Sequence, residues 1–303
     1  MSQESDSNID FPIGKPRKIG WLTDIGKVRE TDEDCVSVSS FGGTFGTIHL
    51  LVVADGMGGH AKGEVASKIA LSRIFTNSFS KIAVSELFNR DTPFASVLKQ
   101  GIKKANDDIL EHTAKNPESS GMGTTAVCAI VIGNKVTLAN VGDSRAYVVS
   151  ANDITQVTTD HSLVQEMVDR DEITKAQASD HPSKNVITRG VGISPSLEVD
   201  TKMVHLKNDE SLLLCCDGVI AHLSDEDIQK IVQDTPDPQD ACKKIVDLTN
   251  ERGGSDNISL IILSKSSHLK DEPNKMPGKP MLPEFFQEKD TKNLDGNKGE
   301  LPN

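Results

Sequence analysis

The sequence is short of positive charge. Its 303 residues contain 33 Lys and Arg against 45 Asp and Glu, which gives a formal net charge of −12 at pH 7. Nucleic acids and anionic membrane surfaces are bound by cationic protein surface, so neither is an expected partner. A phosphorylated substrate would need another source of positive charge at its binding site, and metal ions are the obvious candidates.

Cysteine is scarce and follows no recognisable pattern. The count is odd, no C-x-x-C spacing occurs, and most of the five lie in apolar context: Cys35, Cys128, Cys215, Cys216 and Cys242. This usage favours reduced, buried thiols in a cytoplasmic protein over a disulfide framework. Long apolar runs are also missing. None approaches 18 residues, so no membrane span is expected, and the polar N-terminus lacks the basic and apolar regions of a secretory signal.

Two motifs that handle phosphate are absent. The sequence has no G-x-x-x-x-G-K-[ST] spacing, which excludes a P-loop. No cysteine stands in a C-x₅-R loop, so the thiolate route of tyrosine phosphatases has no support.

The composition changes along the chain and predicts three parts. Residues 1–16 form an expected flexible N-terminal arm and residues 266–303 an expected disordered tail, because both are polar and cannot bury enough surface to become ordered. Residues 17–265 form the folded body. Strands grouped into hairpins, with helices inserted between them, favour an α+β fold over a wound parallel sheet.

The body alternates between short and long periodic segments. Apolar residues recur at intervals of three and four in Glu64–Asn116, Asp225–Gln233 and Pro238–Arg252, which predicts helices there, with a break at "RDTPF" in the first interval. Short segments rich in Val, Ile and Leu and bounded by Gly or Asp predict strands. These are Ile19–Asp24, Cys35–Ser39, Ile48–Ala54, Thr124–Ile132, Lys135–Val141, Ser144–Ser150, Ser211–Cys216 and Ile258–Leu263.

Carboxylates lie at the ends of four of these apolar segments. "GKVRETDEDCV" precedes one, "LLVVADG" and "LLLCCDG" end two others, and "GGSDNISLIIL" begins a fourth. A single Asp after a strand is ordinarily a turn former or a helix cap. Several unpaired carboxylates gathered in one cleft would repel each other unless a divalent cation lay between them. Oxygen ligands without a His/Cys cluster select Mg²⁺ or Mn²⁺ over Zn²⁺.

The glycines of "DGMGGH" fit the same interpretation. Gly56 can present its backbone carbonyl to an ion beside Asp55, while Gly58 and Gly59 allow a tight turn and a close approach to a ligand. A glycine-rich hairpin with no ligand is the alternative.

Eight motifs, in order from about residue 17 to 264, resemble the metal-dependent Ser/Thr protein phosphatases of the PPM, or type 2C, family in their compact bacterial form. They are "TDIGKVRETDED", "VVADGMGGHAKGEVAS", "GMGTTAV", "LANVGDSRAYVV", "TTDHSLVQEMV", "HPSKNVITRGVG", "LLLCCDG" and "GGSDNISLIIL". The resemblance implies an α+β fold, an αββα β-sandwich of two antiparallel sheets flanked by helix pairs, with a two-metal centre at one edge. It also places a mobile flap at residues 161–185.

The resemblance implies a ligand set for two Mn²⁺ or Mg²⁺ ions and for a third, weaker ion. Asp55 matches the bridging carboxylate, and Asp143 matches the ligand of the third ion, although a plain turn residue is an equal alternative for Asp143. The implied metal ligands are Glu33, Asp34, Asp55, Gly56, Asp143, Asp217 and Asp256.

Two further residues match catalytic positions. Arg29 matches the arginine that binds the substrate phosphate, where a guanidinium offers a planar fork to two oxygens; a solvated surface charge is the alternative. His60 is the candidate proton donor to the leaving oxygen. Met57 stands where eukaryotic members have a histidine, so a packed or solvent-facing histidine is the alternative for His60.

The implied activity is hydrolysis of phosphoserine and phosphothreonine in proteins by in-line attack of a metal-bridging hydroxide, with no phosphoenzyme. The expected substrates are proteins phosphorylated by Ser/Thr kinases in the cytoplasm. A regulator dedicated to one phosphorylated partner is an alternative. A catalytically silent phosphoprotein-binding module would have lost ligands, whereas Asp55, Asp217 and Asp256 are all present.

Overall fold

The computed structural model describes residues 17–43, 46–58, 62–88 and 93–265. The predicted N-terminal arm, the predicted tail and His60 lie outside these ranges. The strands are β1 (Ile19–Asp24), β2 (Cys35–Gly43), β3 (Gly46–Ala54), β4 (Gly56–Met57), β5 (Gly123–Thr124), β6 (Ala126–Ile132), β7 (Lys135–Val141), β8 (Arg145–Val149), β9 (Ile154–Gln156), β10 (Asp200–His205), β11 (Ser211–Cys215) and β12 (Ile258–Leu263). The α-helices are α1 (Gly63–Phe88), α2 (Phe94–Lys115), α3 (Leu163–Asp169), α4 (Lys175–Ser179), α5 (Asp217–Ile220), α6 (Asp225–Asp234) and α7 (Pro238–Glu251).

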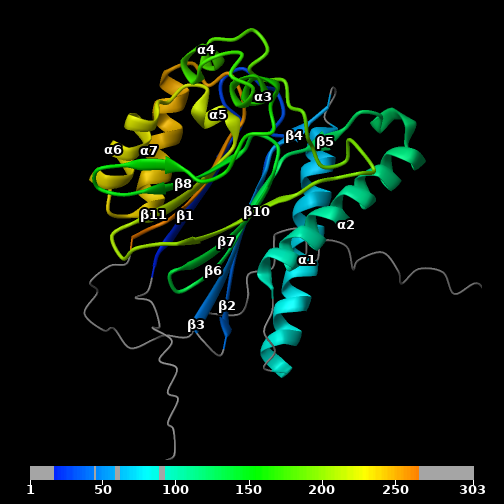
Figure 1. The fold of residues 1–303 in the computed structure, drawn as a ribbon, viewed down its shortest axis with the longest axis horizontal. Coiled ribbons are helices and arrows are strands. Elements are labelled where there is room, and N and C mark those ends of the chain that lie inside the picture. The colour runs from blue at the N-terminus through cyan, green and yellow to red at the C-terminus, as the bar shows by residue number, and fades with distance from the viewer. Residues whose placement is uncertain (1–16, 44–45, 59–61, 89–92, 266–303) are drawn as a thin grey trace, which may run out of the picture.

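Two five-stranded sheets lie between two groups of helices (Figure 1). The strand orders are β1-β12-β11-β8-β9 and β10-β7-β6-β3-β2, and every strand pair in the described part of the chain is antiparallel. Helices α1 and α2 cover the second sheet, whereas α6 and α7 cover the first. The predicted αββα sandwich is therefore confirmed. Within the described ranges, no helix has the length and apolar character needed to cross a bilayer.

Alternation along the central strands builds three hydrophobic layers. In β3, Leu50 and Val52 pack against the α1/α2 helices, while Leu51 and Val53 pack between the two sheets. A third layer joins the first sheet to α6 and α7. All four β3 side chains are buried, and each contributes about 1.5–3 kcal/mol relative to an exposed position. The strands that carry the site are thus held on both faces.

The strand register brings the distant acidic segments to one end of the sandwich. Cys35 pairs with Ala54, so β2 begins where β3 ends. Arg145 pairs with Cys215, so β8 begins where β11 ends. β12 begins at the same end, because it runs antiparallel to β11. Residues just before or after these strand ends therefore meet, although they are up to about 220 positions apart in the sequence.

Several elements differ from the sequence-based expectation, among them the short elements β4, β9 and α5, which were not predicted. The predicted strand Thr124–Ile132 is divided into β5 and β6, because the Thr125 N–H donates to the Asp55 carbonyl (2.8 Å) instead of continuing one ladder. The edge strand β10 was not predicted. Five of its six residues are exposed, so it lacks apolar alternation and forms by pairing with β7.

Candidate metal centre

Asp55 lies between β3 and β4, where the structure fixes its backbone from both sides. The Asp55 N–H donates to Thr125 Oγ1 (3.0 Å), and the Asp55 carbonyl accepts from the Thr125 N–H and from Thr124 Oγ1 (both 2.8 Å). These three bonds use only backbone atoms of Asp55. Its carboxylate stays available for the centre.

A buried pair of hydroxyls connects this backbone to the turn that carries Asp143. Thr125 Oγ1 and Ser144 Oγ lie 2.7 Å apart, and both residues are buried. Ser144 follows Asp143 in the turn between β7 and β8. The pair therefore sets the position of two predicted ligands relative to each other. Neither hydroxyl was assigned from the sequence, although "GMGTTAV" and "GDSR" contain them.

Glu33 lies against the start of α1. Its Oε1 accepts from the Gly63 N–H (3.3 Å), and its carbonyl accepts from the Gly56 N–H (3.2 Å). The unpaired N–H groups at a helix start favour a carboxylate there. A Cβ at Gly56 would lie 2.3 Å from the Gly63 carbonyl oxygen and 2.4 Å from that of Glu33, so no side chain fits. Glycine is required here by this close approach.

Asn257 attaches the loop that contains Arg29, the predicted phosphate-binding residue, to the first sheet. Its Nδ2 donates to the carbonyls of Ile25 and Thr31 (3.0 Å each), and its Oδ1 accepts from the Glu33 N–H (2.9 Å). The Asn257 N–H donates to Asp256 Oδ1 (2.9 Å). One buried amide thus positions acidic side chains from both ends of the chain. This role of Asn257 was not predicted from the sequence.

The surroundings of the Asp34 carboxylate indicate a bound cation more directly than any other feature of the site. Only 6% of its surface is exposed, and neither carboxylate oxygen has a hydrogen-bond partner among the described residues. The two nearby donors serve other acceptors: Ser259 Oγ donates to Thr23 Oγ1, and the Cys216 thiol donates to the Asn257 carbonyl. Burial raises the pKa of Asp34 to about 7. A buried carboxylate without a partner is costly unless a cation compensates it.

The neighbouring carboxyls show the same excess of negative charge. Burial, and then the charges of Asp34, Asp217 and Asp143, raise the pKa of Asp55 well above its ordinary range. Burial also raises the pKa of Asp217, whose carboxyl lies beside that of Asp55. Burial and the Asp217 charge raise the pKa of Asp143 to about 7. Carboxylate oxygens and the Gly56 carbonyl are the hard donors that fit Mn²⁺ or Mg²⁺.

Arg29 lies at the rim of this cluster. It is exposed, and its Nη2 donates to Asp256 Oδ2 (2.7 Å). The structure thus brings Arg29 together with all seven predicted metal ligands at one end of the sandwich. Their assignment as ligands remains a prediction, and His60 lies outside the described residues.

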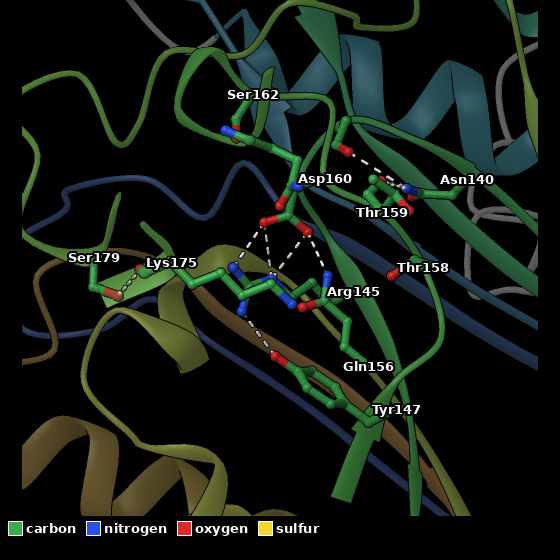
Figure 2. Close-up of polar contacts among 12 residues, drawn as sticks. Asn140, Arg145, Tyr147, Gln156, Thr158, Thr159, Asp160, Ser162, Lys175 and Ser179 are labelled. Atoms are coloured by element: carbon green, nitrogen blue, oxygen red, sulfur yellow. Dashed lines mark hydrogen bonds and ion pairs between the residues drawn. The ribbon is translucent and has the colours of Figure 1, made fainter. Parts of the chain in front are cut away.

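A partly buried ion pair lies at the start of β8, where Arg145, two residues after Asp143, contacts Asp160 (Figure 2). Arg145 donates to both oxygens of Asp160 through Nε and Nη2 (2.7–3.0 Å), and its Nη1 donates to the Tyr147 hydroxyl (2.9 Å). Gln156 Nε2 also donates to Asp160 (2.7 Å). The pair joins the first residues of β8 to the segment that leads into the predicted flap.

The predicted flap begins on the same turn. The His161 N–H donates to the Gly142 carbonyl (2.9 Å), and the Gly142 N–H donates to His161 Nδ1 (3.1 Å). Ser162 and Ile187 form a β-bridge, which joins the start of the predicted flap to the segment that follows it. The flap contains two short helices, α3 and α4. Its mobility stays a prediction.

Comparisons with known proteins agree on one family. The model of protein phosphatase 2C matches residues 29–174 and 183–258. The serine/threonine phosphatase stp of Listeria welshimeri is 33% identical over 252 residues, which cover 81% of this chain and 95% of that protein. The solved serine/threonine phosphatase PstP/Ppp of Mycobacterium tuberculosis has a TM-score of 0.73 and 29% identity, covering 83% of this chain and 99% of that structure.

Two further solved structures are similar over the same body. Stp1 from Staphylococcus aureus has a TM-score of 0.73 and 32% identity, covering 83% of this chain and 96% of that structure. The catalytic domain of PstP in complex with two manganese ions has a TM-score of 0.69 and 29% identity, covering 82% and 97%. This chain therefore belongs to the protein phosphatase 2C family.

Proposed function

We propose that this protein is a Mn²⁺- or Mg²⁺-dependent phosphatase that hydrolyses phosphoserine and phosphothreonine in proteins. The observation that carries the proposal is the buried Asp34 carboxylate without a partner, surrounded by carboxyls whose pKa values are raised. The relatives named above as serine/threonine phosphatases support the substrate class.

Each predicted ligand has a role in this proposal. Glu33, Asp34, Asp55, Gly56, Asp143, Asp217 and Asp256 would hold two ions and a weaker third. Such ions lower the pKa of a coordinated water and offset phosphate charge when bound. The protein fixes its own donors beforehand: Thr124 and Thr125 hold the Asp55 backbone, and Asn257 holds the loop of Glu33.

Arg29 would bind two oxygens of the substrate phosphate. Its guanidinium is charged at every working pH and has a rigid fork of N–H donors. The ion pair with Asp256 keeps it at the rim of the carboxylate cluster. Arg29 thereby supplies positive charge where a phosphate enters an otherwise acidic protein. The leaving oxygen of serine or threonine needs a proton, and His60 remains the predicted donor.

The physiological substrates would be proteins phosphorylated by Ser/Thr kinases in the cytoplasm, so the protein would oppose kinase signalling. All five cysteines are free, and four are buried, in keeping with a reducing compartment. Residues 175–182, which include α4, fall in the gap of the family match. This part of the flap is therefore where we place the selectivity for a particular phosphoprotein.

A direct test measures phosphate release by the full chain from phosphothreonine, phosphoserine and phosphotyrosine peptides. We expect release from the first two with Mn²⁺ or Mg²⁺, little release from the third, and loss of all activity with EDTA. Hydrolysis that resists EDTA would contradict the metal assignment. Binding of the phosphopeptides without turnover would favour a silent recognition module.

Replacing Arg29 by alanine should raise KM about 10-fold or more while kcat changes less. The reason is that Arg29 contacts phosphate in both the ground state and the transition state. Lys27→Ala is the matched control, because it removes a positive charge from the same loop; its KM should change less than about twofold. Steady-state kinetics with a phosphothreonine peptide measure both values. A fall in kcat with unchanged KM would contradict the binding role.

A further inference from the structure

We propose that a pocket beside the edge strand β10, outside the metal centre, binds a small hydroxycarboxylate. The pocket has a volume of about 130 Å³, whereas a single water needs only about 10–15 Å³ on the same scale. It therefore has room for a molecule of several heavy atoms. Its lining includes Leu138, Asn140, Val157, Thr158, Asp200 and Lys202, and we call it the β10-edge pocket.

The strand register explains why polar groups line the β10-edge pocket. Val136 and Leu138 of β7 point into the layer between the two sheets, and Asn140 continues the same row. Asp200 of β10 pairs with Asn140, and Lys202 pairs with Leu138. The side chains of Asp200 and Lys202 therefore lie on this face as well. The intersheet layer thus becomes polar where it reaches the edge strand.

The buried amide of Asn140 indicates what a ligand must offer. Asn140 is 3% exposed, and its Nδ2 donates to the carbonyls of Thr159 (3.1 Å) and Gly142 (3.4 Å) (Figure 2). These two acceptors fix the orientation of the amide, because only its nitrogen can donate. The Oδ1 atom has no hydrogen-bond partner among the described residues. A buried acceptor without a donor is costly, so the ligand must carry an O–H or N–H group.

The charges around the pocket favour an anion that also carries this donor. Arg189 Nη1 donates to Asp200 Oδ1 (3.0 Å), so these two charges cancel. His161 lies 3.2 Å from the other oxygen of Asp200, but burial lowers the pKa of this histidine, which is neutral at pH 7. Lys202 is exposed on the same face of β10. It leaves one positive charge in excess at the pocket.

A hydroxyl and a carboxylate on adjacent carbons meet both requirements. The hydroxyl would donate to Asn140 Oδ1, and the carboxylate would accept from the Lys202 ammonium. These two residues are diagonal neighbours across the β7/β10 pair, about 7–8 Å apart at Cα, which a small molecule with a hydrogen bond at each end spans. An amino group in place of the hydroxyl would add positive charge where it is already in excess.

A ligand bound to Asn140 would contact an amide that already connects two functional segments. Its Nδ2 bonds reach Gly142, next to Asp143, and Thr159, next to the start of the predicted flap. The ligand is thus placed where it can affect the segment that leads into the flap. The inference concerns binding outside the metal centre and stands whether or not the protein proves to be a phosphatase.

Titration of the metal-free, ¹⁵N-labelled full chain with glycolate, acetate and glycine tests the proposal without any turnover. Glycolate should shift the side-chain N–H₂ signals of Asn140 and bind with a Kd in about the millimolar range, because it has few atoms. Acetate lacks the hydroxyl and should bind at least about fivefold more weakly. Glycine, with its ammonium group, should also bind more weakly than glycolate.

Two exposed lysines provide a matched pair of variants that should both fold. Lys202→Gln should weaken glycolate binding at least about threefold, whereas Lys243→Gln, the same change at an exposed position of α7, should leave it nearly unchanged. Equal binding of glycolate and acetate, tighter binding of glycine, or unchanged binding in Lys202→Gln would overturn the proposal. Asn140 signals that do not respond to glycolate would mean that the pocket holds only water, which overturns it as well.

Discussion

Replacing Asp55 by asparagine should abolish metal-dependent hydrolysis and at the same time stabilise the metal-free protein. Asparagine has nearly the same shape, and the bonds to Thr124 and Thr125 use only backbone atoms, so the fold is kept. The loss of an ion that supplies several kcal/mol of transition-state stabilisation should lower kcat by at least about 10³-fold. The gain in stability follows from removing one of several carboxyls that repel each other.

The two effects are measured separately. Phosphopeptide hydrolysis with Mn²⁺ gives kcat, and thermal unfolding with and without Mn²⁺ gives the stability of each form. The variant should have an equal or higher Tm without metal, and the rise in Tm that Mn²⁺ causes in the unsubstituted protein should be largely lost. Asp247→Asn, the same change at an exposed position of α7, should alter neither readout. Turnover retained in Asp55→Asn would contradict the central position of this carboxylate.

The sequence predicts the side chains of the metal centre better than it predicts the hydrogen-bonding residues that position them. A carboxylate directly after an apolar run, as at Asp55 and Asp217, is conspicuous because the run predicts a buried strand and the charge cannot stay inside it. The meeting of these ends follows from strand register, such as Cys35 opposite Ala54. Single-strand patterns contain no information on register, so only the family resemblance supplied the convergence.

The supporting residues were missed for a different physical reason. Thr125, Ser144 and Asn257 are small polar residues beside turns, where such residues usually serve the local backbone. Their function depends on partners far away in the sequence: Asn257 bonds to Ile25 and Thr31 about 230 positions earlier. No local pattern distinguishes such an amide from an ordinary turn former.

The β10 segment shows the converse limit, in which a local pattern gives a misleading answer. It is polar and exposed, which predicts a loop, yet it pairs with β7 over six residues. This outcome is decided by a neighbouring strand in the fold.

Breaking the ion pair between Arg145 and the buried Asp160 should have the largest effect on stability. The Asp160 side chain is only 9% exposed and accepts bonds from Arg145 and Gln156. In Asp160→Asn, an amide N–H₂ would face these donors and the Arg145 charge would lose its partner. We expect the free energy of unfolding to fall by about 3 kcal/mol, which corresponds to a Tm lower by roughly 6–12 °C in a domain of this size.

The exposed pair of Arg170 and Glu172 offers a matched control for this change. Its atoms approach as closely (2.8 Å), but the side chains are 54% and 48% exposed, so water already solvates both charges. Glu172→Gln makes the same replacement of carboxylate by amide and should cost less than about 0.5 kcal/mol. Urea unfolding of the two variants in the presence of EDTA compares them without a contribution from bound metal.

A double substitution separates the cost of an orphaned charge from the value of the pair itself. Because a largely shielded charge without its partner is the main penalty of either single change, Arg145→Met combined with Asp160→Leu should recover a large part of the stability that either one removes. The pair also joins β8 to the segment entering the flap (Figure 2), so the single variants should loosen the turn that carries Asp143 and weaken Mn²⁺ binding. Equal losses of unfolding free energy in Asp160→Asn and Glu172→Gln would show that this pair stabilises the fold no more than an exposed pair does. Strictly additive losses in the double variant would lead to the same conclusion.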